Sequence, residues 1–327
     1  MKLVIALPHR FPLWDAPPWF AEKLRAEFPG LRVVQMAGYA TLEQEISDAD
    51  IALTRELKPS QVHAAKQLKW IHSAAAAVHA LMIPEIRQSN IIVTNATAVH
   101  GPVVAEHALA MILAIARRID LAVKAQTEHI WKQEEIWVTN PPPRDIAGST
   151  LLVVGLGQIG RPLAQKAKAL GMHVIAVREH PERGAETADE VFASKDLLKI
   201  LPRADFVMLC PPVTPDTKEA FGRDQLAAMK PDAYLLNVGR GALIDEPALI
   251  EALQQRRIGG AALDVTSVEP LPSDSPLWAL DNCMITPHTG GISPKLWERQ
   301  YIFFTENLRR FLAGKPLLGL VDKSRGY

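Results

Sequence analysis

The sequence is poor in several features that would place a protein in a specialised class. It has two cysteines in 327 residues, and its 36 Lys and Arg residues are balanced by 36 Asp and Glu residues. Cys210 and Cys283 form no metal-binding or redox spacing, so we expect no metal site and two buried thiols in a reducing compartment. The balanced charge gives no general attraction to nucleic acid or to an anionic membrane. We therefore expect recognition of a small molecule in a local site.

Long apolar runs are also scarce. The longest stretch, 103–116, contains Glu106 and His107, whereas a membrane span needs about 20 apolar residues. We expect this stretch to form a buried helix with Pro102 in its first turn. The apolar run at 3–7 is too short for the core of a signal peptide and fits a first strand. The sequence therefore predicts a soluble, cytoplasmic protein.

Strand-like apolar runs alternate with helix-like segments along the whole chain. This alternation predicts parallel sheets of the α/β class, and the length favours two domains. The second block of runs is long enough for a complete doubly wound sheet. The runs of the first block are KLVIAL, RVVQMA, IALT, LKWIHS and IIVTN, and those of the second are TLLVVG, HVIAV, DFVMLC, AYLLNVG, GAALDV and CMITPH.

An amphipathic segment, SPKLWERQYIFFTENLRRFLAG, follows the second block. Because the second sheet is complete before this segment begins, we expect the segment to return to the first block. The first domain is then discontinuous, with residues 1–100 and 290–327. The second domain, residues 101–289, is inserted into it.

Three glycines follow the first strand of the second block. Gly155, Gly157 and Gly160 lie in LVVGLGQIG, between a strand pattern and a helix pattern. In dinucleotide-binding folds these glycines make the tight turn, admit the pyrophosphate and allow close packing of helix on strand. The amides at the start of the helix favour an anion. The motif therefore predicts a dinucleotide cofactor, and the alternative is a purely structural turn.

Five motifs follow one another along the chain: NATAVHGPVVAEHALAMILA (95–114), LVVGLGQIG (152–160), NVGRGALIDEPALIEAL (237–253), GAALDVTSVEPLP (260–272) and ITPHTGG (285–291). Together they resemble the motifs of the D-isomer-specific 2-hydroxyacid dehydrogenases. This family has a mid-chain cofactor domain flanked by two pieces of a substrate domain, which is the layout expected above. The resemblance implies a flavodoxin-like substrate-binding domain at 1–100 and 290–327, and an NAD(P)-binding Rossmann domain at 101–289.

Three residues just past predicted strands match the catalytic positions of the family. The resemblance implies that Arg240 binds the substrate and that Glu269 and His288 form the acid–base pair. A guanidinium offers a planar fork of donors to the oxygens of a 2-keto acid. A histidinium can protonate the oxygen that hydride addition leaves negative, and a carboxylate on its other nitrogen favours the charged ring. Taken singly, each residue is more often a surface or capping group: Arg240 could pair with Asp245, and Glu269 could be a solvated turn residue.

The loop HSAAAAVHAL (72–81) matches the glycine-rich loop with which the family binds the substrate carboxylate, but alanines replace the glycines. We expect Ala76 and Ala77 to offer backbone amides to that carboxylate, which requires negative φ angles. His79 stands where the family commonly has Asp, and we expect it to be structural. His100 and Arg55 are candidates either for the pocket or for packing.

The resemblance also implies the cofactor contacts, which lie in the glycine-rich loop and just past the other strands of the Rossmann domain. They are Gly155, Gly157, Gln158, Ile159, Gly160, Arg178, Arg183, Cys210, Pro211, Thr217, Val238, Gly239, Arg240, Asp264, His288 and Gly290.

Arg178 ends the second strand of this domain, where a carboxylate usually binds the adenosine ribose. It follows Gly160 by 178 − 160 = 18 residues, close to the expected spacing of about 20. In the family an Asp here accompanies NAD, because a carboxylate repels the 2′-phosphate of NADP. Arg178, assisted by Arg183, therefore predicts NADP(H) in preference to NAD(H). The alternatives are a solvated strand end, an adenine-stacking residue, or NAD bound through Glu179 or Glu182.

The sequence thus predicts an NADP-preferring reductase of a small 2-keto acid. The tail LLGLVDKSRGY is similar to those of glyoxylate/hydroxypyruvate reductases, while formate dehydrogenases of the family pair the histidine with glutamine rather than with Glu269. The alternative is a non-catalytic, nucleotide-sensing corepressor of the same family. The resemblance also implies a homodimer, in which the passage 130–145 reaches the partner. Trp137 then approaches the partner's active site, or Trp131 and Trp137 are ordinary packing residues.

Overall fold

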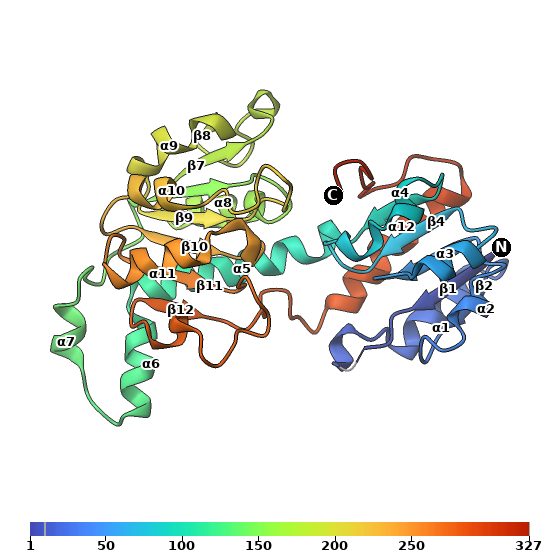
Figure 1. Cartoon of the computed structure of the whole chain (residues 1–327), viewed down its shortest axis with the longest axis horizontal. Coiled ribbons are helices and arrows are strands. Elements are labelled where there is room, and N and C mark those ends of the chain that lie inside the picture. The colour runs from blue at the N-terminus through green and yellow to red at the C-terminus, as the bar shows by residue number, and fades with distance from the viewer. Residues whose placement is uncertain (10, 327) are drawn as a thin grey trace. The chain divides into compact units, whose positions relative to one another are not determined.

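The chain forms two compact units. The computed structural model describes residues 1–9 and 11–326, so Tyr327, the last residue of the tail segment, lies outside the described residues. Contacts divide the chain into Met1–His100 with Ile292–Tyr327, and Gly101–Gly291. The second unit is inserted into the first, and its end at Gly291 lies slightly beyond the expected boundary at 289. Each unit is a parallel sheet with helices on its faces (Figure 1).

Within the described residues, the first unit contains a five-stranded sheet in the order β2-β1-β3-β4-β5. All five strands coincide with predicted apolar runs, and β1, β3 and β4 are buried along their whole length, as expected for a parallel sheet covered on both faces. The strands are β1 (Lys2–Ala6), β2 (Arg32–Gln35), β3 (Ile51–Thr54), β4 (Trp70–Ser73) and β5 (Ile92–Asn95). The helices between them are α1 (Pro18–Glu27), α2 (Leu42–Glu45), α3 (Pro59–Ala64) and α4 (Pro84–Arg87).

The C-terminal helix α12 (Leu296–Leu312) packs on this first sheet. Phe304 is fully buried and stacks on Trp70 of β4, with ring centroids 5.4 Å apart and planes inclined by 16°. The indole N–H of Trp297 donates to the carbonyl oxygen of Leu13 at 2.9 Å. The amphipathic pattern therefore correctly predicted a helix that returns to the first block.

The second unit contains, in the described residues, a seven-stranded sheet in the order β12-β11-β10-β9-β6-β7-β8. The prediction of six strands was wrong, because it omitted β8. This edge strand has four residues, EVFA, all only half-buried, so it has no apolar run. The strands are β6 (Thr150–Val154), β7 (His173–Arg178), β8 (Glu190–Ala193), β9 (Phe206–Leu209), β10 (Tyr234–Asn237), β11 (Gly260–Leu263) and β12 (Cys283–Ile285).

The long apolar helix begins earlier than predicted. It runs over Thr97–Ala116 with Pro102 in its interior, so the placement of Pro102 in the first turn was wrong. Val99 is buried in a cluster with Ala96 and Leu296, and this packing offsets the backbone donor that proline lacks. The helices of the second unit are α5 (Thr97–Ala116), α6 (Ile119–Thr127), α7 (Gln133–Trp137), α8 (Gly160–Ala169), α9 (Leu197–Ile200), α10 (Arg223–Ala228) and α11 (Glu246–Gln254).

By length and composition alone, α5 would suffice to cross a membrane. One face of the helix, including Ala108, Met111, Ile112 and Ile115, is instead buried in one core cluster with residues of β6 and β9. Core helices of soluble proteins pass the same test, so the helix is weak evidence for a membrane span. The structure places it as a core element of the second unit.

One titratable side chain lies in the core of the first unit. His72 of β4 is fully buried, and its Nδ1 lies 2.7 Å from Oγ1 of Thr94. The same hydroxyl accepts the indole N–H of Trp70 at 2.8 Å. Burial lowers the pKa of His72 from 6.5 to about 3, so the ring is neutral in the folded protein at neutral and mildly acidic pH.

We predict that acid destabilises the protein in part through His72. Its folded-state pKa is about 3, below the ordinary value, so the unfolded chain binds a proton that the folded chain does not. Stability is therefore lost as the pH falls from about 6.5 towards 3, by about 1.4 kcal/mol per pH unit. His72→Asn should flatten this dependence in urea unfolding measured at a series of pH values. Equal slopes for the two proteins would contradict the assignment.

Candidate active site

The predicted site residues of the second unit gather at one edge of its sheet. Gly155, Cys210 and Asp264 directly follow β6, β9 and β11, while Arg240 and His288 follow β10 and β12 within three residues. Since all strands are parallel, their carboxyl ends share this edge (Figure 1). The direction of winding reverses between β6 and β9, and ligands of doubly wound folds bind at such a point.

The glycine-rich loop has the form that a dinucleotide requires. Gly155 has φ of +101°, and a side chain there would lie 2.8 Å from the backbone nitrogen of Pro211. A Cβ on Gly160 would lie 2.2 Å from the carbonyl oxygen of Gly155. At Gly157, in contrast, no described atom lies within 4 Å of such a Cβ. The loop thus leaves open space before the start of α8, which fits the pyrophosphate of a dinucleotide.

The neighbouring loops of this edge are held by local hydrogen bonds. The thiol of Cys210 donates to the carbonyl oxygen of Gly155 at 3.1 Å, and burial raises its pKa to about 12. Oγ1 of Thr217 donates to the carbonyl oxygen of Pro212 and accepts the amide of Thr214, both at 2.7 Å. Both cysteines are free, but each is half-buried and not fully buried as the sequence predicted. Gln158 is exposed, Ile159 is half-buried and Val238 is buried.

Glu269 and His288 form a hydrogen-bonded pair. Nδ1 of His288 lies 2.6 Å from Oε2 of Glu269, and the amide of Thr266 donates to Oε1 at 3.2 Å. Burial raises the pKa of the Glu269 carboxyl, but the bond and charge of His288, the Thr266 amide and the charge of Arg240 outweigh it and lower the pKa. The carboxylate is therefore ionised at neutral pH. The side chain of His288 is 49% exposed, and Nε2 has no hydrogen-bond partner among the described residues.

The backbone of His288 is held in an uncommon conformation. Its φ is +53°, in the left-handed region that non-glycine residues rarely adopt. Its amide donates to the carbonyl oxygens of Asp264 and Thr286, both at 2.9 Å. Such strain persists only where surrounding contacts over-determine it, and it is concentrated at functional sites.

Asp264 fixes the loop that carries His288. It is 3% exposed and accepts the hydroxyl of Thr286 at 2.6 Å and the amides of Thr289 and Gly290 at 2.9 and 3.0 Å. Nε2 of His107 lies 3.2 Å from Oδ1. Burial raises the pKa of Asp264, but these hydrogen bonds lower it to about 2. Thr286 was not identified from the sequence. The one sequence signal for His107 was that a polar residue interrupts the apolar stretch 103–116.

Arg240 is positioned by the end of β10. Nδ2 of Asn237 donates to the carbonyl oxygen of Arg240, and Oδ1 accepts the amide of Gly239, both at 2.9 Å. Burial lowers the pKa of the Arg240 guanidinium, while the charge of Glu269 opposes the shift. Nη1 of Arg240 donates to the Gly239 carbonyl at 2.7 Å, whereas Asp245 accepts the amide of Ala248 as the N-cap of α11. Asn237 was not identified from the sequence.

Arg178 is not a solvated strand end, so that alternative was wrong. It is 9% exposed, and its Nη1 lies 2.7 Å from Oε1 of Glu186. Arg161, in the first turn of α8, contacts the same carboxylate through Nη2 at 3.3 Å. Arg183 is exposed at the end of the 3-10 turn Pro181–Arg183. Glu186 was missed because it lies in an irregular loop without a repeating pattern.

In the first unit, the alanine loop follows β4. Nδ2 of Asn95 donates to the carbonyl oxygen of Ala76 at 2.8 Å, and Nε2 of the buried Gln300 donates to that of Ala74 at 2.5 Å. Ala76 and Ala77 have no positive φ. Their amides have no acceptor among the described residues. Ala76 and Ala77 thus have the negative φ angles that backbone donors at these positions require.

The other candidates of the first unit make packing contacts. The guanidinium of Arg55 donates to the carbonyl oxygen of Trp14, and burial lowers its pKa. The rings of Trp14 and His100 have centroids 6.3 Å apart. His79 begins the 3-10 turn His79–Leu81.

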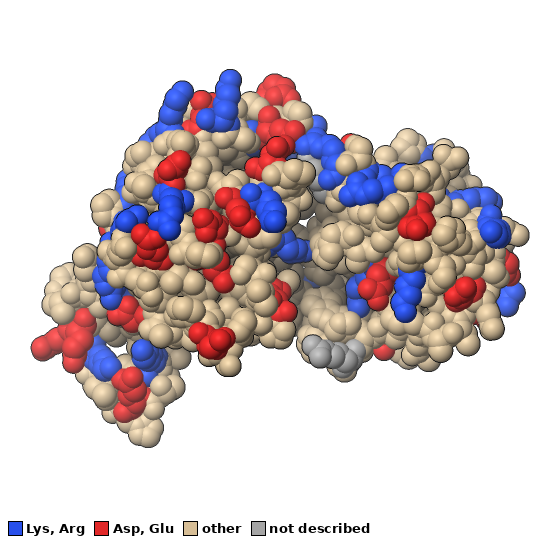
Figure 2. All heavy atoms as spheres, viewed as in Figure 1, with Lys and Arg blue, Asp and Glu red and all other residues tan. Residues whose placement is uncertain are grey.

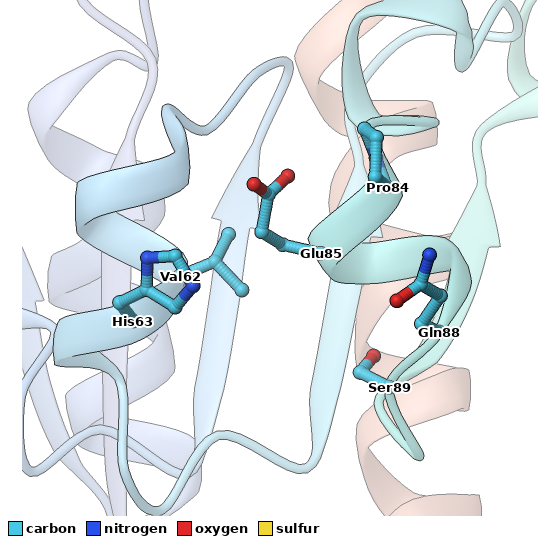
Figure 3. Close-up of a pocket in the computed structure, with 6 residues that line it drawn as sticks. All are labelled: Val62, His63, Pro84, Glu85, Gln88 and Ser89. Carbon is cyan, nitrogen blue, oxygen red and sulfur yellow. The ribbon is translucent and has the colours of Figure 1, made fainter.

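A surface hollow, the distribution of charge and the absence of metal-ligand clusters in the described part of the chain add no further residue to the candidate site. A hollow of the first unit lies between α3 and α4, and no predicted site residue lines it (Figure 3). On the face drawn in Figure 2, acidic and basic side chains are interspersed over each unit. Among the described residues, no group of three or more His, Cys, Asp or Glu could hold a metal ion. The hollow is lined by Val62, His63, Pro84, Glu85, Gln88 and Ser89.

Residues 109–290 match the family described as D-isomer specific 2-hydroxyacid dehydrogenase, NAD binding domain. D-3-phosphoglycerate dehydrogenase of Methanocaldococcus jannaschii is 34% identical over 284 residues, which are 86% of this chain and 53% of that protein. The chain thus spans about half the length of this and similar curated relatives.

Two solved structures resemble the chain over its whole length. A D-isomer specific 2-hydroxyacid dehydrogenase from Xanthobacter autotrophicus Py2, in complex with NADPH and MES, has 31% identity and a TM-score of 0.85, covering 100% of this chain and 99% of that one. An NADPH-dependent glyoxylate/hydroxypyruvate reductase from Sinorhizobium meliloti, in complex with NADP and sulfate, has 27% identity and a TM-score of 0.82, with the same coverage. The chain belongs to the D-isomer specific 2-hydroxyacid dehydrogenase family.

Proposed function

We propose that the protein reduces a small 2-keto acid to the D-2-hydroxy acid with NADPH. The observation that carries this proposal is the 2.6 Å hydrogen bond between Glu269 and His288, next to a sheet edge that also holds Arg240 and the glycine-rich loop. In this proposal His288 is the acid, Glu269 is its supporting carboxylate and Arg240 binds the substrate carboxylate. A non-catalytic nucleotide sensor needs only the glycine-rich loop.

Arg240 binds the substrate in this proposal. The guanidinium presents parallel donors to the carboxylate and the adjacent carbonyl oxygen of the 2-keto acid. Within the first unit, we propose that the amides of Ala76 and Ala77 are neutral donors to a carboxylate. Because Arg240 is half-buried, its charge is screened less by water than that of a surface arginine.

The glycine-rich loop and the first turn of α8 hold the cofactor. Amides at the start of the helix bind the pyrophosphate, and the space at Gly157 admits it. When bound, the nicotinamide supplies the hydride that reduces the carbonyl carbon. Arg178 and Arg183 bind the 2′-phosphate of NADP.

His288 supplies the proton in this mechanism. Protonated Nε2 gives its proton to the carbonyl oxygen as negative charge develops there. Glu269 accepts the Nδ1–H, fixes the orientation of the ring and favours its charged form. Because the pKa of Glu269 is lowered, the carboxylate stays ionised and takes no proton from the ring.

Glyoxylate and hydroxypyruvate are the proposed substrates. The name of the Sinorhizobium meliloti reductase supports this choice. The D-3-phosphoglycerate dehydrogenases, of which the matched segment of this chain covers about half the length, are named for a different acid. Initial rates with glyoxylate, hydroxypyruvate and the oxidised form of D-3-phosphoglycerate, each with NADPH and NADH, test the proposal. No turnover with any 2-keto acid would favour the nucleotide-sensing alternative.

The acid–base pair gives the first prediction of the proposed chemistry. His288→Ala should lower kcat by about 10²–10⁴-fold, the usual contribution of general acid–base catalysis, while NADP⁺ binding in calorimetry stays largely intact. Glu269→Gln removes the negative charge next to the ring, so the pH–rate profile should differ from that of the wild type. Arg240→Ala should damage substrate binding more than Glu269→Gln does. Full activity of the His288 variant would overturn the mechanism.

The second prediction concerns Arg178. Hydrogen bonds to charged groups contribute about 1.5–3 kcal/mol, so wild-type kcat/KM should be about 10- to 100-fold higher with NADPH than with NADH. Arg178→Asp should lose NADPH activity and keep or improve NADH activity, because Asp accepts from the ribose hydroxyls. Arg183→Ala should cause a smaller loss, confined to NADPH. A wild type that prefers NADH, with a ratio unchanged by Arg178→Asp, would refute the assignment.

The exposed apolar surface of the second unit supports the proposal of a homodimer. Trp131 is 87% exposed, and Trp137 and Val138 are 70% and 74% exposed. These residues lie in and beside α7, which together with α6 projects from the seven-stranded sheet (Figure 1). Large apolar side chains exposed on one projecting segment are typical of association surfaces, and we propose that a second copy of the chain covers them.

We predict that light scattering at micromolar concentration gives twice the chain mass of 36.0 kDa. Trp137→Glu combined with Val138→Glu should shift the protein to monomers, since burying a charge in an apolar interface is costly. Trp278, which is 54% exposed, provides the control, because Trp278→Glu should leave the dimer intact. A monomeric wild type would exclude the arrangement.

A further inference from the structure

Two arginines at the cofactor edge share one carboxylate. Nη1 of Arg178 lies 2.7 Å from Oε1 of Glu186, and Nη2 of Arg161 lies 3.3 Å from the same oxygen. Nε of Arg161 also contacts the second carboxylate oxygen. The cluster carries two positive charges and one negative charge, so one positive charge is left over.

The cluster lies where a dinucleotide cofactor places its adenosine ribose. Arg178 is the last residue of β7, the strand next to β6, and Arg161 follows the third glycine of the loop. A carboxylate at this point normally accepts from the ribose hydroxyls. Here the end of the strand provides an arginine, and the carboxylate comes from the loop before β8.

We propose that Glu186 is the residue that sets the choice between NADPH and NADH, by competing with the 2′-phosphate for Arg178 and Arg161. Carboxylate and phosphate are the two anions that guanidinium binds by the same parallel hydrogen bonds. Glu186 therefore occupies donors that the phosphate needs, and its negative charge repels the phosphate. This inference rests on the proposed function for the identity of the cofactor.

The two cofactors meet different forms of the cluster. With Glu186 on the arginines, the site presents a carboxylate to the hydroxyls of an unphosphorylated ribose. With Glu186 displaced, the two guanidiniums present their donors to the 2′-phosphate. Both forms can bind a dinucleotide, so Glu186 tunes the ratio of the two affinities and does not abolish either.

Glu186 is less constrained by its surroundings than Arg178. Its side chain is 28% exposed, against 9% for Arg178. Its backbone has φ of +52°, a left-handed conformation that costs a non-glycine residue energy. It lies in the irregular segment between the turn Pro181–Arg183 and β8. Arg178, in contrast, is held by its place in the sheet, where it pairs with Ala193.

Glu186→Gln tests the proposal, because it removes the charge and keeps the size of the side chain. Isothermal titration calorimetry would measure the binding of NADP⁺ and NAD⁺, and of adenosine 2′,5′-bisphosphate and 5′-AMP, which differ only in the 2′-phosphate. We expect the variant to bind NADP⁺ and the bisphosphate about tenfold more tightly, the size of one charged hydrogen bond. Its affinity for NAD⁺ should fall or stay constant.

Glu251 provides a matched control. This residue of α11 also contacts two arginines, Arg223 and Arg257, but it lies in a helix and not at the end of a strand. Glu251→Gln removes the same charge from a similar environment and should leave the ratio of the two affinities at the wild-type value.

Two results would overturn the proposal. If Glu186→Gln weakens the binding of NADP⁺, the carboxylate only positions Arg178. If the ratio of the affinities for NADP⁺ and NAD⁺ is the same in Glu186→Gln as in the wild type, the cluster lies outside the 2′-phosphate site. These readouts need no turnover, so they are separate from the test of the proposed reaction. A protein that binds NADP⁺ with the expected shift but reduces no 2-keto acid would refute the function and leave this inference standing.

Discussion

The geometry of the candidate site depends on the hydrogen bonds that the buried carboxylate of Asp264 accepts. A buried charge is costly unless hydrogen bonds satisfy it, and this one accepts from the Thr286 hydroxyl and from the amides of Thr289 and Gly290. These donors belong to the segment that follows β12, while His107 reaches Asp264 from α5. One charge thus joins a helix, a strand end and a loop, and the loop carries His288 with its strained backbone.

The site uses its two carboxylates for different purposes, and their surroundings explain the difference. Asp264 is 3% exposed and its hydrogen bonds lower its pKa to about 2, so it remains charged throughout the working range and serves as a fixed anchor. Glu269 is more accessible and binds a group that changes its own charge during the proposed reaction. A carboxylate next to a histidine stabilises the protonated ring most when water is partly excluded. The buried Asp264 is therefore the fixed anchor of the loop, and the half-exposed Glu269 is the partner of His288.

The sequence was sufficient for most of the fold because strands of a covered parallel sheet are continuous apolar runs. The runs predicted all five strands of the first unit and six of the seven in the second, while β8 was missed because EVFA is half-buried at a sheet edge. The glycine-rich loop was recognisable because its requirements are local. The contact of His107 with Asp264 was not, since 264 − 107 = 157 residues separate them, and only the tertiary structure brings them together.

The pairing of Arg178 with Glu186 follows from the same physics as the anchor at Asp264. An arginine that is nine-tenths buried at a strand end cannot remain without an anion, because desolvation of the charge would be uncompensated. In a protein that binds a phosphorylated ribose there, the ligand provides that anion only while it is bound. A carboxylate from a nearby loop stabilises the ligand-free form, and by doing so it weakens the binding of the ligand. In the proposed complex with NADP, stability of the free protein and affinity for the 2′-phosphate are therefore opposed at Arg178, and Glu186 would set the balance between them.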